Sequence, residues 1–316
     1  MSNNKHLLPH LGFLAVYLLW GINISSMKIG GQEWDPVMFN GLRYACIVPM
    51  LWLMAYMYSR RSGISLRMEK KDLGLILFLG VLSAVGMEVM LSYALQFSNA
   101  ANGSVLGRGF MPVLTVIIAL ALREIRVTPR ILIGLPLAFA SVIVIVAGGG
   151  GGLHFGGDTL RGDLLLLLRS LFGAIYLILM SRLTSRYPLM LLIAWEMSAG
   201  AAVLLPYVLW KGDAAFYADI SATGWTSLAY TALLATVVGF TLHNWSLARL
   251  GPFKASFYGY ILPITAAVSG YYLLKESITV YQVLGGIGVL AAMYLVQRDR
   301  QQKSVQTASR EAGREA

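Results

Sequence analysis

Long runs of apolar residues, separated by short polar segments, follow one another along the whole chain. A helix that crosses the hydrocarbon core of a bilayer needs about 20 consecutive apolar residues. Runs of that length predict ten transmembrane helices, at 8–29, 36–58, 72–97, 100–122, 129–149, 160–182, 187–211, 222–248, 252–274 and 279–297. The connections are short, which leaves no room for a soluble catalytic domain. The pattern therefore predicts an all-α integral membrane protein.

Composition agrees with this class, because 57% of the residues are hydrophobic and 13% are charged. A soluble domain is closer to a quarter charged. The single cysteine, Cys46, excludes an internal disulfide and a cysteine-based metal site. No cofactor or metal is expected. The first apolar run is too long for a signal-peptide core, so we expect it to be an uncleaved span.

Lysine and arginine are distributed unevenly between the two sets of alternating connections. One set, which includes both termini, holds 18 of the 25 basic residues, and the other set holds four. Because cytoplasmic loops are enriched in Lys and Arg, this bias predicts that both termini are cytoplasmic. It also explains the net charge of +10 without nucleic acid as a partner. The polar segment 298–316 is expected to be a disordered cytoplasmic tail.

The sequence also resembles itself at a spacing near 152 residues. LWGINI at Leu19 matches LFGAIY at Leu171, and further pairs follow in the same order: Pro36 and Pro188, Pro112 and Pro263, Glu124 and Glu276, Gly134 and Gly286. This predicts repeats at 8–149 and 160–297, joined by an external glycine-rich linker at 150–159. Five spans per repeat insert in opposite orientations. Inverted repeats around a central site are a common plan of secondary transporters.

Several of these residues together resemble the EamA family of the drug/metabolite transporter superfamily. They are Trp20 and Gly21, then Pro36 with Arg43, the prolines of spans four and nine, and the glutamates that follow them. The resemblance implies ten helices in two inverted repeats around a central cavity. It also implies transport of small metabolites, often amino-acid export, across the bacterial inner membrane. Four charged residues depart from the family pattern: Glu88, Arg108, Arg169 and Glu196.

Charges within apolar spans are informative, because each costs about 2.5–3.5 kcal/mol on insertion scales and is usually paired or faces a cavity. Glu88 and Arg108 each lie about ten residues, or ~15 Å, from the turn that joins spans three and four. Equal depth makes an ion pair feasible. Two interpretations stay open: the pair fixes packing, or it lines the cavity and meets a substrate charge. Proton uptake by Glu88 is a narrower hypothesis.

Arg43 is expected either to face the pathway or to snorkel outward. Arg169 and Glu196 lie on adjacent spans at depths that differ by ~6 Å, and we expect a structural pair between them. His243 is expected to be interfacial or hydrogen-bonded. Other polar, aromatic and gating candidates, each with a packing role as the alternative, are Trp20, Tyr93, Asn102, Trp195, Tyr258, Tyr260, Pro112 and Pro263.

These features favour a secondary transporter that moves a small polar metabolite, such as an amino acid, by alternating access. Export of cationic drugs, a channel and a lipid flippase are the alternatives. ATP hydrolysis is not expected, because the chain lacks a P-loop. An intramembrane enzyme is not expected either, because Ser104 does not lie in a G-x-S-x-G turn. The expected partners are the bilayer and a small molecule. Protons as coupling ion, and a monomer or a dimer, stay open.

Overall fold

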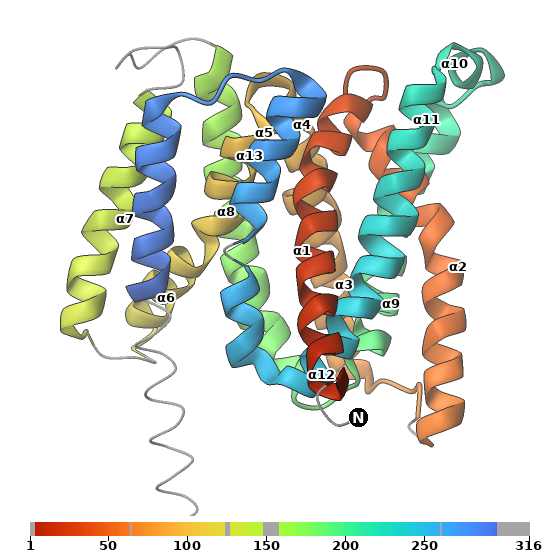
Figure 1. Ribbon diagram of the computed structural model, residues 1–316. Helices are drawn as coiled ribbons and strands as arrows, with labels where there is room; N and C mark the ends of the chain where they lie inside the picture. Colours follow the sequence, from red (N-terminus) through yellow and green to blue (C-terminus); the bar gives the residue numbers. More distant parts are fainter. Residues whose placement is uncertain (1–3, 64, 124–126, 148–157, 260, 296–316) are drawn as a thin grey trace, which may run out of the picture.

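The computed structural model describes residues 4–63, 65–123, 127–147, 158–259 and 261–295. Within these ranges the chain is helical and contains no strand, with the helices standing side by side (Figure 1). This follows from the apolar runs, because a helix pairs its own backbone polar groups where no water is present. The predicted tail at 298–316, most of the predicted linker, Glu124 and Tyr260 lie outside the described residues.

Eight helical stretches within the described ranges are long and apolar enough to cross a membrane, and they confirm the first eight predicted spans. Their elements are α1 (Asn4–Gly30), α2 (Pro36–Ser62), α3 (Lys70–Val81) with η1 (Leu82–Val89) and α4 (Met90–Phe97), α5 (Ala100–Ser104) with η2 (Val105–Gly109) and α6 (Met111–Ala121), α7 (Pro129–Ala147), α8 (Asp158–Thr184), α9 (Leu189–Lys211), and α11 (Ala222–Ala229) with η3 (Tyr230–Val238) and α12 (Gly239–Tyr258). The short α10 (Ala214–Asp219) joins α9 to α11.

The ninth and tenth predicted spans correspond to shorter apolar helices, α13 (Ile261–Leu274) and Val280–Leu295. The predicted boundary between spans eight and nine is wrong, because α12 stays helical through 249–251 and ends at Tyr258. The break falls instead four residues before Pro263. Proline has no N–H with which to bond the carbonyl four residues earlier, so a continuous helix is weakest at this point.

Three of the spans contain π-helical segments, which the sequence pattern did not predict. They are η1 in the third span, η2 in the fourth and η3 in the eighth. Within η2 the Phe110 N–H bonds the Val105 carbonyl, five residues back, and Pro112 then lies in the first turn of α6. The proline thus starts a new helical segment. Glu88 lies on η1 and Arg108 on η2, and π-helical turns often occur at functional sites.

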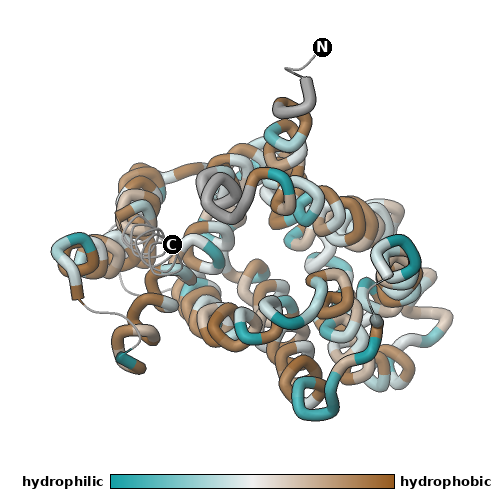
Figure 2. The backbone as a smooth tube through the Cα atoms, turned by 90° about the horizontal axis from the view of Figure 1, so that it is seen from below, coloured by the Kyte–Doolittle hydropathy of each residue, from teal (hydrophilic) through white to brown (hydrophobic). Residues whose placement is uncertain are grey.

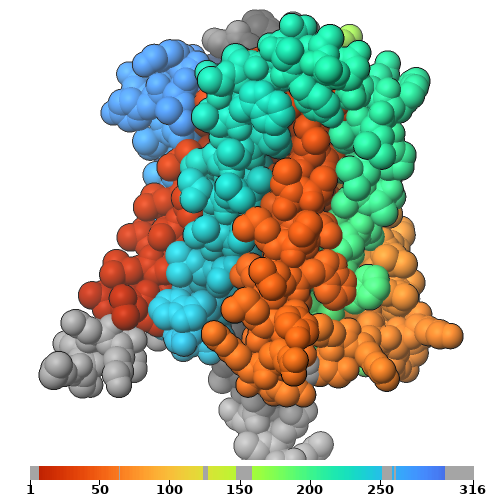
Figure 3. All heavy atoms as spheres, turned by 90° about the vertical axis from the view of Figure 1, so that its right-hand side faces the viewer, coloured from red at the N-terminus to blue at the C-terminus, as the bar shows by residue number. Residues whose placement is uncertain are grey.

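The helices surround a central region when the molecule is seen along their axes (Figure 2). Helix α1 packs against α12 and α13, and α8 packs against α4 and α6. Helix α2 packs against η3 and α9, and it lies between them on the face shown in Figure 3. On the outside, apolar side chains such as Leu209 and Trp210 are 79% and 75% exposed, as expected of surfaces that face lipid rather than water.

Candidate functional site

A cavity of about 400 Å³ lies between the helices and collects most of the predicted charged residues. Its lining includes eight of the predicted site and gating residues: Trp20, Arg43, Glu88, Arg108, Pro112, Arg169, Glu196 and Pro263. The volume lies in the range of small-molecule sites. The lining comes from α1, α2, η1, α5, η2 and α6 on one side of the linker, and from α8, α9, η3, α12, α13 and the helix Val280–Leu295 on the other.

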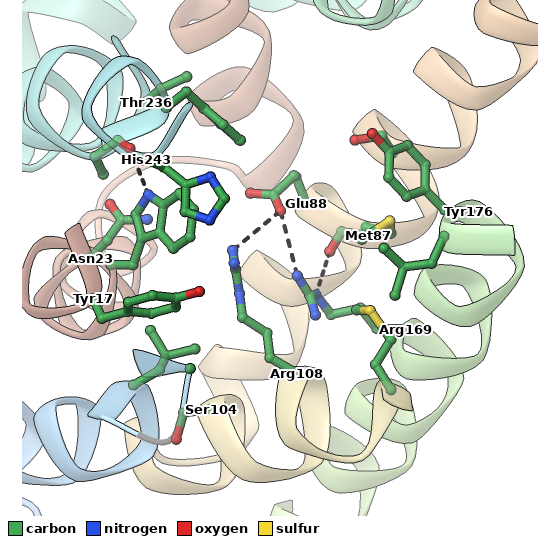
Figure 4. Close-up of a pocket in the computed structure, with 18 of the residues that line it drawn as sticks. Tyr17, Asn23, Met87, Glu88, Ser104, Arg108, Arg169, Tyr176, Thr236 and His243 are labelled. Atoms are coloured by element: carbon green, nitrogen blue, oxygen red, sulfur yellow. Dashed lines mark hydrogen bonds and ion pairs between the residues drawn. The ribbon is translucent and has the colours of Figure 1, made fainter. Parts of the chain in front are cut away.

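Glu88 is the centre of a cluster of three arginines, Arg43, Arg108 and Arg169, which we call the arginine cluster. Figure 4 shows the contacts of Glu88 with Arg108 and Arg169. Two guanidinium nitrogens of Arg43 each lie 3.1 Å from Glu88 Oε2. Glu88 Oε1 lies 3.5 Å from Arg169 Nη2 and 3.9 Å from Arg108 Nη2. The predicted contact between Glu88 and Arg108 is therefore present, but it is the longest of the three.

Arg43 and Arg169 are held as buried structural partners of Glu88. Their side chains are 4% and 1% exposed. Arg169 also donates to the Met87 carbonyl at 3.0 Å and to the Gly107 carbonyl. These bonds tie α8 to the π-helical segments of spans three and four. A buried guanidinium needs such partners, because an unpaired charge in a low-dielectric interior is expensive.

Arg108 differs from the other two arginines in its exposure and in its distance from Glu88. Its side chain is 32% exposed, and its guanidinium lies 3.9 Å from the Glu88 carboxylate. Its buried Nε, like that of Arg43, has no hydrogen-bond partner among the residues described. The guanidinium carbon lies 5.9 Å from the centre of the Trp20 ring, within reach of a cation–π contact. In Figure 4 Arg108 extends between Tyr17 and Arg169. It is thus the arginine most available to a molecule in the cavity.

The predicted pair between Arg169 and Glu196 is wrong. Arg169 pairs with Glu88 instead, and Glu196 Oε2 accepts a hydrogen bond of 2.7 Å from the Tyr176 hydroxyl. The reason is the difference in depth along the two helices: η1 brings Glu88 to the level of Arg169, whereas Glu196 lies nearer to Tyr176, two helical turns further along α8. Both glutamates line the cavity.

Four of the predicted site residues do not line the cavity. Asn102 is buried and bonds Asp163 at 2.9 Å and Gln282 at 3.1 Å. Trp195 packs edge-on against Trp52, Tyr258 bonds His10 at 2.6 Å, and Tyr93 is 38% exposed. For Asn102, Trp195 and Tyr258 the packing role, which the sequence left as the alternative, describes the observed contacts.

Other lining residues were given no site role by the sequence. His243 lies 5.1 Å from Trp20, ring centre to ring centre, and both face the cavity with Tyr17 and Asn23. Asn23 Oδ1 is buried and unpartnered within the described chain. Little in the sequence indicated that these residues line a site, because an isolated polar or aromatic residue in an apolar span is as common in helix packing as in a binding site. Helical spacing connects Tyr17 and Trp20, which lie three residues apart on one face.

A second polar cluster, formed by Lys28, Glu276, Ser98 and Ala100, joins helices at one end of the bundle, and we call it the Lys28 clasp. Lys28 Nζ lies 2.7 Å from Glu276 Oε1 and donates to the Ser98 carbonyl at 2.6 Å. The Ala100 N–H donates to Glu276 Oε2 at 2.9 Å. Lys275 has a φ of 57°, and the Glu276 N–H bonds the Gly270 carbonyl six residues back, which ends α13 and turns Glu276 toward Lys28.

The chain belongs to the EamA-like transporter family, whose model matches residues 7–147 and again residues 160–298. It is 28% identical to an uncharacterized transporter of Archaeoglobus fulgidus, over 96% of this chain and 100% of that protein. It is 24% identical to a protein of Salmonella typhimurium named a probable amino-acid metabolite efflux pump, over 90% of this chain and 93% of that one.

A solved crystal structure shares the fold. It superposes with a TM-score of 0.61 at 17% sequence identity, and the match covers 96% of this chain and 99% of that chain. Together with the apolar helices, the family match makes this a multi-pass membrane protein of a transporter family.

Proposed function

We propose that the protein is a secondary transporter that exports a small polar metabolite, related to an amino acid, by alternating access. The observation that carries the proposal is the central cavity, which holds five charged side chains at mid-bundle and is lined by both stretches that the family model matches. Charged residues inside a membrane protein mark substrate or ion pathways. The name of the Salmonella typhimurium relative supports the amino-acid assignment.

Alternating access needs two equivalent halves, and three observations support an inverted repeat of five helices each. The same family model matches twice. The first helix of each half packs against the third and fourth helical runs of the other half, as α1 does on α12 and α13, and α8 on α4 and α6. Arg123 and Lys275, 152 positions apart, are the non-glycine residues with positive φ in the described chain.

The two ends of the bundle differ, as alternating access requires. The lining of the cavity extends to Leu189, the first residue of α9, at the end where α1 begins. At the other end the Lys28 clasp lies beyond the lining, and Ser98 and Asn102 bond Asp163 across the two halves. With both termini in the cytoplasm, as the Lys and Arg bias predicts, this arrangement corresponds to an inward-facing state.

The test is counterflow with purified protein in liposomes. Vesicles are loaded with one unlabelled compound, and uptake of the labelled form is measured for a panel of amino acids, nucleosides and cationic drugs. Saturable counterflow of amino acids or their derivatives is the expected result. Exchange of cationic drugs alone contradicts the amino-acid assignment, and conductance without saturation indicates a channel. Movement of labelled lipid alone indicates a flippase.

A further inference from the structure

The charges that line the cavity do not balance. Three arginines, Arg43, Arg108 and Arg169, face two carboxyl groups, Glu88 and Glu196, within the described lining. The sum is positive whether or not Glu196 is ionised. A net charge in a low-dielectric site is costly unless a bound group of opposite sign neutralises it. The imbalance therefore indicates a ligand that brings negative charge into the cavity.

The negative charge is needed at Arg108. Glu88 is already occupied, because Oε2 accepts from two nitrogens of Arg43 and Oε1 lies closer to Arg169 than to Arg108. At 3.9 Å the contact of Arg108 with Glu88 is longer than a hydrogen bond. A guanidinium presents its donors as a planar fork, which matches the two oxygens of one carboxylate.

The rest of the lining combines an apolar and aromatic wall with a few polar side chains, among them Asn23, Ser104 and His243. Trp20 stands beside the guanidinium, and its ring is fixed because the indole N–H donates to the Ala235 carbonyl at 2.9 Å. Phe240 packs edge-on against Trp20 with ring centres 5.6 Å apart. Four methionines complete the wall: Met87, Met111, Met197 and Met293. Thioether side chains adapt to varied apolar shapes and contact aromatic rings favourably.

We infer that Arg108 is the carboxylate anchor of the site, and that the preferred substrates are organic monoanions with an apolar or aromatic body and no free ammonium group. This inference rests on the transport function proposed above and specifies its substrate class. A free ammonium is disfavoured, because it would enter a cavity with surplus positive charge. N-acylated amino acids and simple carboxylic acids fit the site better than zwitterions, and amines fit it worst.

The test uses three probes that share one body and differ in charge at pH 7: N-acetylphenylalanine (negative), phenylalanine (zwitterionic) and phenethylamine (positive). Binding is measured on detergent-purified full-length protein by the ligand-induced rise in Tm, which follows the ratio of ligand concentration to Kd. We expect N-acetylphenylalanine to bind at least about tenfold more tightly than phenethylamine, a factor worth about 1.4 kcal/mol. Phenylalanine is expected to lie between them.

Substitution of Arg108 separates anchoring from folding. Arg108→Gln is expected to abolish the preference for N-acetylphenylalanine, and Arg108→Lys is expected to retain part of it, because a lysine keeps the charge and loses the fork. The Tm without ligand reports any effect on folding. The matched control is Arg249→Gln, because Arg249 stacks on Trp245 at 4.3 Å and does not line the cavity. This control should retain the wild-type preference.

The outcomes separate this inference from the proposed function. Tighter binding of phenethylamine, or no Tm rise with N-acetylphenylalanine, overturns the monoanion class even if liposomes show counterflow of other solutes. An unchanged preference in folded Arg108→Gln overturns the anchor. Binding of N-acetylphenylalanine that depends on Arg108 but is never accompanied by counterflow supports the site and contradicts transport.

Discussion

Glu88 and Glu276 are two carboxylates of nearly equal exposure, 14% and 15%, in opposite electrostatic situations. Among the described residues, Glu276 has one cationic partner, Lys28, and one backbone donor, the Ala100 N–H. Glu88 has three arginines within 4 Å. The Lys28 clasp is therefore balanced one to one, whereas the arginine cluster has positive charge in excess.

The comparison shows that charged clusters in one membrane protein can suit different roles, depending on whether their charges balance. A balanced pair gains from staying together, so the Lys28 clasp suits the closing of one end of the bundle. An unbalanced cluster gains from taking up a counter-charge, so the arginine cluster suits a ligand. The substitutions below test this contrast, from the largest expected effect to the smallest.

Removal of the charge of Glu88 should have the largest effect. Glu88→Gln leaves the buried guanidiniums of Arg43 and Arg169 without a counter-charge, and loss of one partner of a buried pair costs about 3–5 kcal/mol. The expected result is a large fall in Tm and in the yield of folded protein, measured by size-exclusion chromatography in detergent.

The compensating variant gives the control. Glu88→Gln combined with Arg43→Gln should recover part of the lost Tm, because it removes the cation held most closely by Glu88. A wild-type Tm for Glu88→Gln alone would contradict the structural role of the cluster.

Removal of the ion pair in the Lys28 clasp should have the next largest effect on stability. Glu276→Gln removes the ion pair with Lys28, whose side chain is 22% exposed, and is expected to lower stability by about 1 kcal/mol. It should also favour opening at that end. The measurement is labelling of a reporter cysteine, Ser104→Cys in a Cys46→Ala background, by an impermeant maleimide applied from the Lys28 side.

Labelling of the reporter should be several-fold faster in Glu276→Gln than in its parent. The matched control is Lys211→Gln, because Lys211 stacks on Trp210 and takes no part in the clasp. Equal labelling rates in Glu276→Gln and its parent would show that the clasp does not control access.

Substitution of Asp163 should change stability less, because Asp163 lies near the Lys28 clasp and forms hydrogen bonds but no ion pair with the described residues. Its Oδ1 accepts from Ser98 at 2.6 Å and from Asn102 at 2.9 Å, and its buried Oδ2 has no hydrogen-bond partner among the described residues. Asp163→Asn keeps an acceptor at Oδ1 and should change stability by less than about 1 kcal/mol.

Thermal unfolding compares this variant with Asp163→Ala. The alanine leaves Ser98 and Asn102 without their acceptor, so its Tm should fall clearly below that of Asp163→Asn. Equal Tm values for the two variants would contradict a hydrogen-bonding role for Asp163.

Substitution of Glu33, which lies in the exposed connection after α1, should have the smallest effect on Tm. It accepts from the Ser221 N–H at 2.7 Å and from the Ser221 hydroxyl at 2.6 Å, and these bonds hold the pKa of its carboxyl below the ordinary value of 4.5. A carboxyl whose pKa is lowered in the folded state stabilises the protein at pH values above its unfolded pKa. This contribution is lost as the pH falls through the lowered pKa of the folded state.

The pH dependence of Tm tests whether the ionised Glu33 carboxyl stabilises the protein. The difference in Tm between wild type and Glu33→Gln should be small at neutral pH and should vanish in acid. A difference that grows as the pH falls below 4.5 would rule out stabilisation by the ionised carboxyl.

The sequence was sufficient to predict the parts of this protein that depend on local chemistry. Apolar runs predicted eight of the spans, because a helix in lipid needs only length and hydrophobicity. The family followed from ordered motifs around Trp20 and Arg43. The turn between spans eight and nine was misplaced, because Gly251 and Pro252 resemble a turn in sequence, whereas the chain stays helical there.

The partners of the charged residues were decided by the tertiary structure alone. Depth along a span predicted that Glu88 and Arg108 lie at one level. Three arginines from α2, η2 and α8 meet at Glu88 because α2 and α8 both pack against η1. The π-helical turns η1 and η2 rotate both side chains by an amount that an apolar pattern does not record. The sequence thus placed charged residues within the apolar spans, and packing decided which of them pair with one another.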